Sequence, residues 1–395
     1  GFLTASHFHV NFSRIGLNNV WDGLGYVVAL GAFSHGWRTG RRASFILGGL
    51  ALGLSQYFYA SSRMLIFLVL GWLVIAGLLD FQRLKARLPD LVIASAAAVV
   101  PLIPLIAFYV RYPNEFMAPL ARFSILGERM RDAIMLSGEA PITIALRQLG
   151  LGLKAFTVEP LHGWYRPETP ILRAIPAGLL LLGIVLMLLR LRDERTWLVI
   201  TWILAFGVVG AMSESTPASQ RYVSVAPALS LGLAYGVEEI ARLFRQAWPR
   251  VANAITVASV ILVAVVAADE LRFYFVEYTP KSQFGGDNGM IAQRLANRVR
   301  GLPPTTQVGF FGSPRMGYQS IPSLRYLAPQ VRGVDMNAPW GSPENPALDG
   351  EPLLFVFLPE RETDLRTALA DLPGGRLTEE ASPRGGILFW VYEGP

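Results

Sequence analysis

The segment 7–22, which reads HFHVNFSRIGLNNVWD, places many hydrogen-bonding side chains directly before an apolar run. Its Arg14 has three possible uses: the guanidinium can reach lipid phosphate, close a structural ion pair or bind a substrate phosphate. Contact with lipid phosphate is the commonest of the three, but the surrounding amides strengthen the case for substrate binding, because a plain lipid anchor needs none of them. Asn18 and Asn19 can instead cap the helix expected from residue 20, and Asp22 would be favourable near its N-terminal dipole.

His7 and His9 in the same segment raise the question of a metal site. Two positions apart, their rings would share one face of a strand but not one face of a helix. A metal site also needs more ligands than two, and His162 is the other histidine expected on the same side. A divalent metal at His7 and His9 is therefore a hypothesis that still requires a third ligand.

A second polar connection, QYFYASSR (56–63), interrupts the next apolar run. Tyr57 and Tyr59 are residue types expected at a membrane interface, where aromatic belts form. Arg63 follows them, and Arg221 ends another short polar loop. Together with Arg14, these arginines could converge on one phosphate or pyrophosphate. The alternative is three independent interfacial anchors, because arginine is common at that depth.

The composition separates the chain into two parts. The whole is 52% hydrophobic and 16% charged, whereas soluble globular proteins are about 25% charged. Residues 1–269 hold 23 Lys and Arg against 15 Asp and Glu, while residues 270–395 hold 12 against 14. The positive charge lies in short clusters between apolar runs, which is typical of membrane topology and argues against nucleic-acid binding. The chain has no cysteine, which excludes disulfides and cysteine-based sites.

Eight segments of residues 1–268 are apolar over roughly the length that crosses a bilayer. The run 43–79 would be about 55 Å long as one helix, too long for a single crossing, so its polar centre predicts a helical hairpin. The eight expected crossings are 22–37, 43–60, 64–80, 91–110, 171–190, 196–212, 222–241 and 251–268. The sequence thus predicts a mainly α polytopic bundle.

Basic clusters follow every second expected crossing, at 38–42, 82–87, 190–195 and 242–250. The positive-inside rule places these four clusters in the cytoplasm. The opening segment, the long loop 111–170 and the C-terminal part are then expected outside a plasma membrane. Within that loop, residues 141–156 have helical apolar spacing with interspersed cations, which indicates a helix in the interface plane.

Residues 269–395 have the pattern of a small α/β domain. Three short apolar runs predict strands at 306–311, 353–358 and 387–392, and two amphipathic stretches predict helices at 288–299 and 362–372. The chain contains no phosphate-cradling glycine loop, HExxH motif or nucleophile elbow. The motifs alone therefore assign no activity to this domain.

Three stretches together resemble bacterial members of the GT-C membrane glycosyltransferases, which include the protein O-mannosyltransferases and the aminoarabinose transferases of lipid A. They are NFSRIGLNNVWD (11–22), GLALGLSQYFYASSRMLIFLVLGWL (49–73) and FYVRYPNEFMAPLARFSILGE (108–128). The resemblance covers most of residues 5–245, and the order of the motifs is more specific than any one. Arg14 is similar to the family's arginine-bearing segment, and Tyr57, Tyr59 and Arg63 to its Tyr-x-Tyr…Arg connection.

The resemblance implies an extracytoplasmic active site, a polyprenyl-phosphate-linked sugar donor, often a divalent metal, and inverting transfer to a lipid, glycan or protein acceptor. It also implies a catalytic acid in a first external loop that would precede Gly1. The chain would then be an N-terminally truncated fragment, inactive alone, with its catalytic residue unknown. The donor-binding candidates are Arg14, Asn18, Asn19, Tyr57, Tyr59, Arg63 and Arg221. Two alternatives remain: a transporter or flippase of lipid-linked saccharide, and a non-catalytic anchor for the C-terminal domain.

Overall fold

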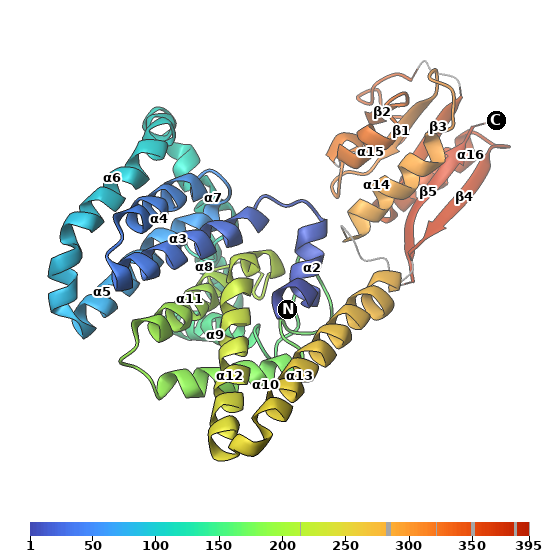
Figure 1. Cartoon of the computed structure of the whole chain (residues 1–395). Coiled ribbons are helices and arrows are strands. Elements are labelled where there is room, and N and C mark those ends of the chain that lie inside the picture. The colour runs from blue at the N-terminus through green and yellow to red at the C-terminus, as the bar shows by residue number, and fades with distance from the viewer. Residues whose placement is uncertain (214, 282–285, 321, 349–351, 383–384, 395) are drawn as a thin grey trace. The chain divides into compact units, whose positions relative to one another are not determined.

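The protein is mainly helical and separates into two compact units. The computed structural model describes residues 1–395 apart from 214, 282–285, 321, 349–351, 383–384 and 395, and apart from the side chains of 120–123 and 128. Helices account for 68% of it. The first unit is Gly1–Glu277 and the second is Tyr278–Pro395 (Figure 1). The boundary expected after residue 268 falls inside the last long helix of the first unit, α13.

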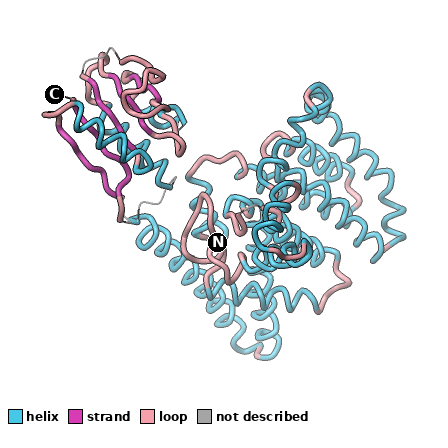
Figure 2. The backbone as a smooth tube through the Cα atoms, turned by 180° about the vertical axis from the view of Figure 1, so that it is seen from behind, coloured by secondary structure: helices cyan, strands magenta, loops and turns pink. Residues whose placement is uncertain are grey.

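The first unit is built from helices α1 to α13, and every described strand belongs to the second unit (Figure 2). The α-helices of the first unit are α1 Phe2–Ala5, α2 His7–Arg14, α3 Val20–Thr39, α4 Arg42–Ser55, α5 Arg63–Leu79, α6 Phe81–Arg111, α7 Pro113–Phe123, α8 Glu128–Ser137, α9 Pro141–Lys154, α10 Ala174–Leu188, α11 Glu194–Ala211, α12 Ala226–Ala247 and α13 Ala252–Arg272. Short 3-10 turns include η1 Ala60–Ser62, η2 Ser219–Arg221 and η3 Val223–Val225.

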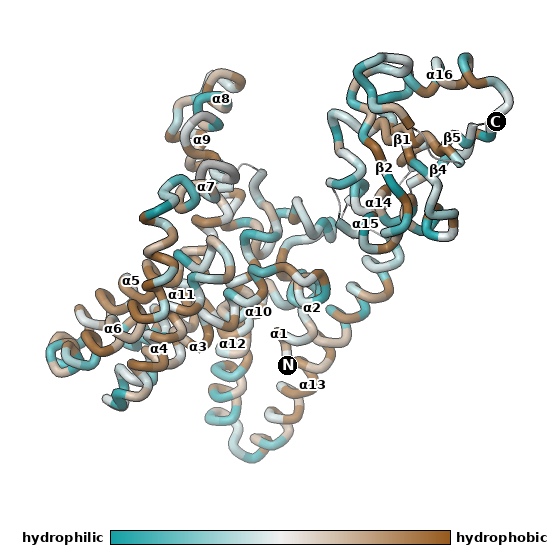
Figure 3. The backbone as a smooth tube through the Cα atoms, turned by 90° about the horizontal axis from the view of Figure 1, so that it is seen from above, coloured by the Kyte–Doolittle hydropathy of each residue, from teal (hydrophilic) through white to brown (hydrophobic). Residues whose placement is uncertain are grey.

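Five helical segments of the described chain are long and apolar enough to cross a membrane, and Figure 3 shows hydrophobic stretches along these helices. They are Ala60–Leu79, Phe81–Arg111, Glu194–Ala211, Val223–Ala247 and Pro249–Lys281. Eight crossings were expected from the sequence, and five segments of the described chain meet the length and hydropathy of a crossing. Helices α4 and α10 are apolar but have 14 and 15 residues, short of the roughly 20 that span a bilayer core. Helix α3 has 20 residues, but it also contains polar and charged residues and is not among the five apolar segments.

The expected break in the run 43–79 is confirmed, because the polar turn that contains η1 separates α4 from α5. The expected basic loop 82–87 is wrong: these residues form the first turns of α6, which Asp80 caps by accepting a hydrogen bond from the Arg83 amide at 2.9 Å. Helix α6 also continues through Pro101 and Pro104. Lys and Arg are good helix formers, so a basic cluster does not by itself mark a loop.

Helix α4 packs closely against α6 because glycine faces small residues. A Cβ on Gly49 would lie 2.1 Å from the Ala94 carbonyl oxygen, and a Cβ on Gly53 would lie 2.3 Å from that of Ala98. Two glycines four residues apart share one helix face, and such spacing lets helix backbones approach in membranes. This contact fixes α6 beside the turn between α4 and α5.

Buried aromatic side chains join α3, α5 and α11 in the centre of the first unit. The Tyr26 ring stacks on Trp202 with centroids 5.4 Å apart, and its edge meets Phe206 at 5.5 Å. Trp37 and Trp72 meet edge to face at 6.0 Å. All these rings are almost fully buried. Aromatic pairs of this kind bury large areas and hold their helices in register.

The second unit is the expected small α/β domain. Its described helices and strands are α14 Gly286–Val299, β1 Gln307–Phe311, α15 Pro322–Leu327, β2 Arg332–Asp335, β3 Leu353–Phe357, α16 Glu362–Asp371, β4 Arg376–Ala381 and β5 Ile387–Glu393. The sheet has the order β2-β1-β3-β5-β4. Strand β1 is parallel to β2 and β3, whereas β5 is antiparallel to β3 and β4. The three predicted strands and two predicted helices are confirmed.

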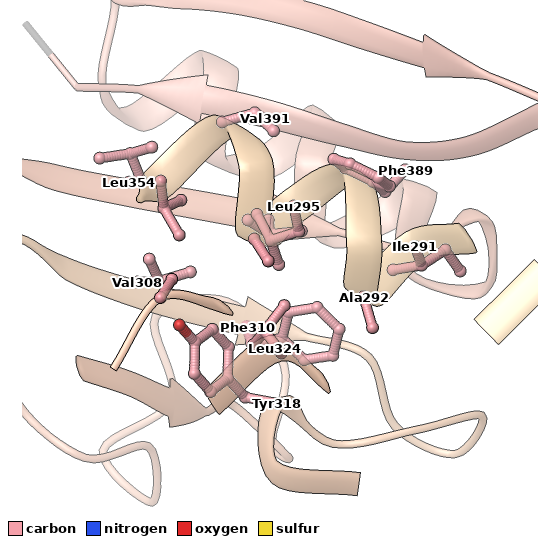
Figure 4. Close-up of a cluster of buried hydrophobic side chains, with 14 of the residues drawn as sticks. Ile291, Ala292, Leu295, Val308, Phe310, Tyr318, Leu324, Leu354, Phe389 and Val391 are labelled. Atoms are coloured by element: carbon pink, nitrogen blue, oxygen red, sulfur yellow. The ribbon is translucent and has the colours of Figure 1, made fainter. Parts of the chain in front are cut away.

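Alternating residues of the central strands bury both faces of this sheet. Val308 and Phe310 pack with Leu295 of α14 in one cluster (Figure 4). Phe311 and Phe357 stack at 4.6 Å in a second cluster, which includes residues of α16. The period-2 alternation of strand side chains accounts for this division. The central strands β1, β3 and β5 therefore have apolar cover on both faces.

Candidate functional site

The first unit contains a cavity of 320 Å³ at the start of α5 and the end of α11, here called the aromatic cavity. Its lining is mainly apolar, with two arginines. The lining residues are Tyr59, Ala60, Ser61, Arg63, Met64, Phe67, Phe116, Met117, Pro119, Ser124, Val209, Met212, Ser213 and Arg221. A bridge between Ser124 and Ser213 joins two of its walls.

Arg63, the first residue of α5, is held between two aromatic rings. Its guanidinium carbon lies 4.3 Å from the Phe116 ring centroid and 5.6 Å from that of Tyr109. The guanidinium donates to the Phe116 carbonyl oxygen at 2.6 Å and to the Tyr109 hydroxyl at 3.2 Å. No carboxylate of the described residues forms an ion pair with Arg63. Its positive charge is thus oriented by neutral partners, which leaves it able to attract an anion.

Arg221, at the end of η2, reaches the same cavity from the other side. Its Nη1 donates to the Tyr59 hydroxyl at 2.7 Å, and both side chains are half-buried. The structure thus brings together Arg63, Arg221 and Tyr59, three of the residues that the sequence predicts for donor binding. A half-buried arginine pair in an apolar wall attracts anions strongly, because little water screens the charge.

A neighbouring cavity of 250 Å³ shares Tyr59 and Arg63 with the aromatic cavity. Tyr57 lines it, and its hydroxyl donates to the Pro101 carbonyl oxygen of α6 at 2.6 Å. Glu115 lines it as well, and it is the one carboxylate among the described residues that borders either cavity. Glu214, next to a lining residue in sequence, lies outside the described part of the chain.

Asn18 and Asn19 hold the loops of the site and line neither cavity. The Asn18 amide donates to the Phe58 carbonyl oxygen at 3.1 Å, and the Asn19 amide donates to that of Gln220 at 3.0 Å. Neither side chain caps α3, although Asn19 occupies the cap position. The asparagines thus fix the backbone beside Tyr59 and Arg221.

Asp22 and Tyr26 complete this attachment from the first turns of α3. The Asp22 carboxylate accepts a hydrogen bond from the Ser61 hydroxyl, and the Tyr26 hydroxyl donates to the Ser61 carbonyl oxygen at 2.8 Å. Asp22 is fully buried, behind the cavity wall that Ser61 forms. We call Asn18, Asn19, Asp22 and Tyr26 the α3 latch, because each bonds a residue of the two loops that carry the site.

Arg14 lies elsewhere in the first unit. Its guanidinium carbon is 5.7 Å from the Tyr274 ring centroid and 5.5 Å from that of Phe275, both just after α13. The structure therefore brings together two of the three arginines that the sequence predicted to converge. The sequence could not show which arginines converge, because this depends on where the packed helices place them. The position of η2 brings Arg221 to α5, whereas Arg14 contacts residues just after α13.

His7 takes part in a buried cluster of its own. Its Nδ1 lies 2.8 Å from the Tyr165 hydroxyl, its backbone N–H donates to Glu270, and its Nε2 is 3.9 Å from the Glu270 carboxylate. Burial and the positive charge of nearby Arg173 lower the pKa of His7 to about 3, and burial lowers the pKa of His9. His7 is therefore neutral at physiological pH.

The metal hypothesis at His7 and His9 finds no support. The two residues lie two positions apart on helix α2, where side chains point in different directions. The described residues contain no group of three His, Cys, Asp or Glu side chains that could hold a metal ion. His7 instead has a structural environment of aromatic and polar neighbours.

Sequence reasoning missed the aromatic partners of Arg63. Tyr109 near the end of α6 and Phe116 in α7 stand in the stretch FYVRYPNEF, an aromatic cluster around a proline after a long apolar run. That composition could have indicated an interfacial binding wall.

Comparison with models of protein families, with curated proteins and with solved structures finds no match for this chain. The geometry of the aromatic cavity therefore stands as the basis for a functional assignment.

Proposed function

We propose that the protein binds the phosphate of a polyprenyl-phosphate-linked sugar in the aromatic cavity, as part of a glycosyltransferase of the plasma membrane. The observation that carries this proposal is the pairing of Arg63 and Arg221 within an otherwise apolar lining. The positive-inside rule supports an extracytoplasmic position for this end of the helices, and for the second unit. The resemblance to GT-C glycosyltransferases supplies the reaction.

The lining suits an amphiphile with one anionic group. Met64, Phe67 and Met117 offer apolar and adaptable contact surface for an isoprenoid chain. The two guanidinium groups offer forked donors that match phosphate oxygens. A soluble sugar nucleotide would call for polar contacts along its whole length, whereas this lining has few. The cavity volume of 320 Å³ lies in the range of about 300–1,000 Å³ that is usual for ligand sites.

The arginines would also assist the chemical step. In the transfer, the bond from the sugar's anomeric carbon to the phosphate oxygen breaks as the acceptor's hydroxyl oxygen bonds to that carbon. Negative charge accumulates on the departing lipid phosphate, and cations already in place there stabilise the transition state. Tyr59, which accepts a hydrogen bond from Arg221, would keep that guanidinium in place.

The acceptor's hydroxyl proton needs a base in the same step. Glu115 lines the neighbouring cavity, which shares Arg63 and Tyr59 with the aromatic cavity. Among the described residues it is our candidate for this base. The aromatic cavity itself has no carboxylate among its described lining residues, so we assign donor binding to it.

A binding titration tests the proposal. The full chain in detergent is titrated with citronellyl phosphate, a short isoprenoid phosphate, and with citronellol as the uncharged control. We expect Arg63→Gln to raise the dissociation constant for the phosphate by roughly tenfold or more, because one charge-assisted contact of about 1.5–3 kcal/mol is lost. Arg14→Gln is the matched control and should bind as wild type. Equal binding of phosphate and alcohol, or equal losses in both variants, would refute the assignment.

A further inference from the structure

A second pocket, of 540 Å³, lies at the opposite end of α11 and is dominated by arginine. Its described lining residues are Arg38, Arg83, Arg190, Arg192, Asp193, Glu194 and Arg195, and we call it the arginine pocket. They come from the end of α3, the start of α6 and the connection between α10 and α11. Three of the basic clusters that the sequence predicts on the cytoplasmic side thus meet here.

The arginine pocket has a surplus of positive charge. Arg83 pairs with Asp80 at 3.2 Å, Arg190 with Glu239 at 2.5 Å and Arg195 with Asp193 at 2.6 Å. With Arg242, which shares Glu239, six arginines face four carboxylates including Glu194, a net charge of +2. Such a concentration of cations in one concavity attracts anions from solution or membrane.

Two of the arginines remain available for a ligand. The side chains of Arg38 and Arg192 are exposed and form no hydrogen bond or ion pair with the part of the chain that the structure describes, although the charge of Arg38 acts on nearby Asp193. They enter the pocket from different connections, the end of α3 and the turn before α11. Their forked donors are therefore free to bind two sides of a phosphate group.

The walls of the arginine pocket are held in place by hydrogen bonds to and from their backbone. The Trp72 indole donates to the Glu194 carbonyl oxygen at 2.8 Å, and the Trp197 indole donates to that of Leu191 at 2.8 Å. Asp193 caps α11 by accepting from the Arg195 amide at 3.0 Å. The backbone that presents the arginines is thus anchored before any ligand arrives, which lowers the ordering cost of binding.

We propose that the arginine pocket is a second binding site, for a phosphate group carried by an anionic lipid headgroup or by a soluble phosphate. The apolar residues beside it favour the lipid: Leu78 is 81% exposed and Leu189 is 77% exposed, at the two helix connections that flank the pocket. Acyl chains could cover these side chains while the headgroup lies among the arginines. Basic pockets between membrane helices commonly take anionic headgroups in this way.

The test uses the full chain in detergent and follows its thermal unfolding. The ligands are dioleoyl phosphatidylglycerol, dioleoyl phosphatidylcholine, whose choline offsets the phosphate charge, and inorganic pyrophosphate. The variants are Arg38→Gln/Arg192→Gln and the control Arg250→Gln, an exposed arginine in the connection between α12 and α13. Neither arginine side chain of this pair hydrogen-bonds to the described chain, so the melting temperature of the double variant without ligand should be close to that of wild type.

Phosphatidylglycerol should stabilise wild type and Arg250→Gln at concentrations at which phosphatidylcholine does not. The double variant should need at least tenfold more phosphatidylglycerol for the same shift. If pyrophosphate alone gives the arginine-dependent shift, the bound phosphate is soluble rather than lipid. The proposal is overturned if wild type responds to none of the anions selectively, or if the double variant responds as Arg250→Gln does.

Discussion

The two ends of α11 hold arginine in two different ways. At its C-terminal end, Arg63 and Arg221 of the aromatic cavity are oriented by rings, a hydroxyl and a carbonyl oxygen. At its N-terminal end, most arginines of the arginine pocket pair with carboxylates. The helix has 18 residues and is about 27 Å long, close to the roughly 30 Å thickness of a bilayer core. One helix that is long and apolar enough to cross a membrane thus connects the two candidate phosphate sites.

The different partners of the arginines at the two sites predict a different ligand selectivity for each site. Arg63 has neutral partners among the described residues and lies in a mainly apolar wall, so its charge suits one anion with an apolar body. Arginines in an open, partly neutralised pocket suit exchangeable anions. We therefore expect the aromatic cavity to recognise a specific ligand and the arginine pocket to accept several phosphate carriers.

The largest expected effect comes from removing both arginines of one site at a time. Arg63→Gln/Arg221→Gln should weaken binding of citronellyl phosphate by about a hundredfold, since two charge-assisted contacts of at least 1.5 kcal/mol each are lost. Arg38→Gln/Arg192→Gln should leave it unchanged. Isothermal titration of both double variants measures this. Similar losses in the two variants would show that the sites are not independent.

The next effect concerns the α3 latch, which supports the aromatic cavity alone. Asn19→Ala should destabilise the first unit by about 1 kcal/mol, because the partly buried Gln220 carbonyl oxygen loses its donor. It should also weaken citronellyl phosphate binding. The phosphatidylglycerol shift of the arginine pocket should persist. Thermal unfolding with each ligand separates these outcomes, and equal loss at both sites would mean global disruption.

A pH titration gives a smaller effect that involves neither site. The folded-state pKa of His7 is lowered to about 3 from 6.5, so the unfolded chain binds more protons between these values. The contribution of His7 to stability should be fully present above pH 6.5 and fall as the pH drops toward 3, by up to about 1.4 kcal/mol per pH unit.

His7→Gln should make this decline shallower, whereas His35→Gln, which changes an exposed histidine of α3, should not. Denaturant unfolding at pH 7, 6 and 5 is the measurement. An unchanged slope in His7→Gln would show that the buried histidine does not control the acid response.

The smallest effect is a difference in salt dependence between the sites. Screening acts more strongly on exposed charges than on partly buried ones. Raising the sodium chloride concentration from 50 to 500 mM should weaken phosphatidylglycerol binding in the arginine pocket several-fold more than citronellyl phosphate binding in the aromatic cavity. If binding at the two sites depended equally on salt concentration, the charges of the two sites would be equally exposed and the comparison between them would fail.

Much of the fold follows from local sequence signals. The run 43–79 is too long for one crossing and has a polar centre, so the break between α4 and α5 could be predicted. The central strands β1, β3 and β5 are apolar on both faces and were found for that reason. Strands β2 and β4 were missed because RGVD and RLTEEA are polar, as edge strands commonly are.

The candidate site could be predicted only in part. Arg63 follows its polar turn directly in sequence, and the fold places Arg221 across the cavity from it. The polar segment 7–22 has the composition of a ligand site, because it holds three asparagines and an aspartate. The structure uses Asn18, Asn19 and Asp22 to attach loops that lie far away in the chain. Such long-range partners depend on helix packing, which residue types alone do not specify.

The most direct measurement of the central claim is photo-cross-linking with an isoprenoid phosphate that carries a diazirine on its chain. After irradiation of the full chain in detergent, the labelled peptides are identified by mass spectrometry. We predict label in residues 59–67 and 113–119, which line the aromatic cavity, and loss of that label with excess citronellyl phosphate. Label confined to other helices, or label that excess phosphate does not displace, would contradict the account.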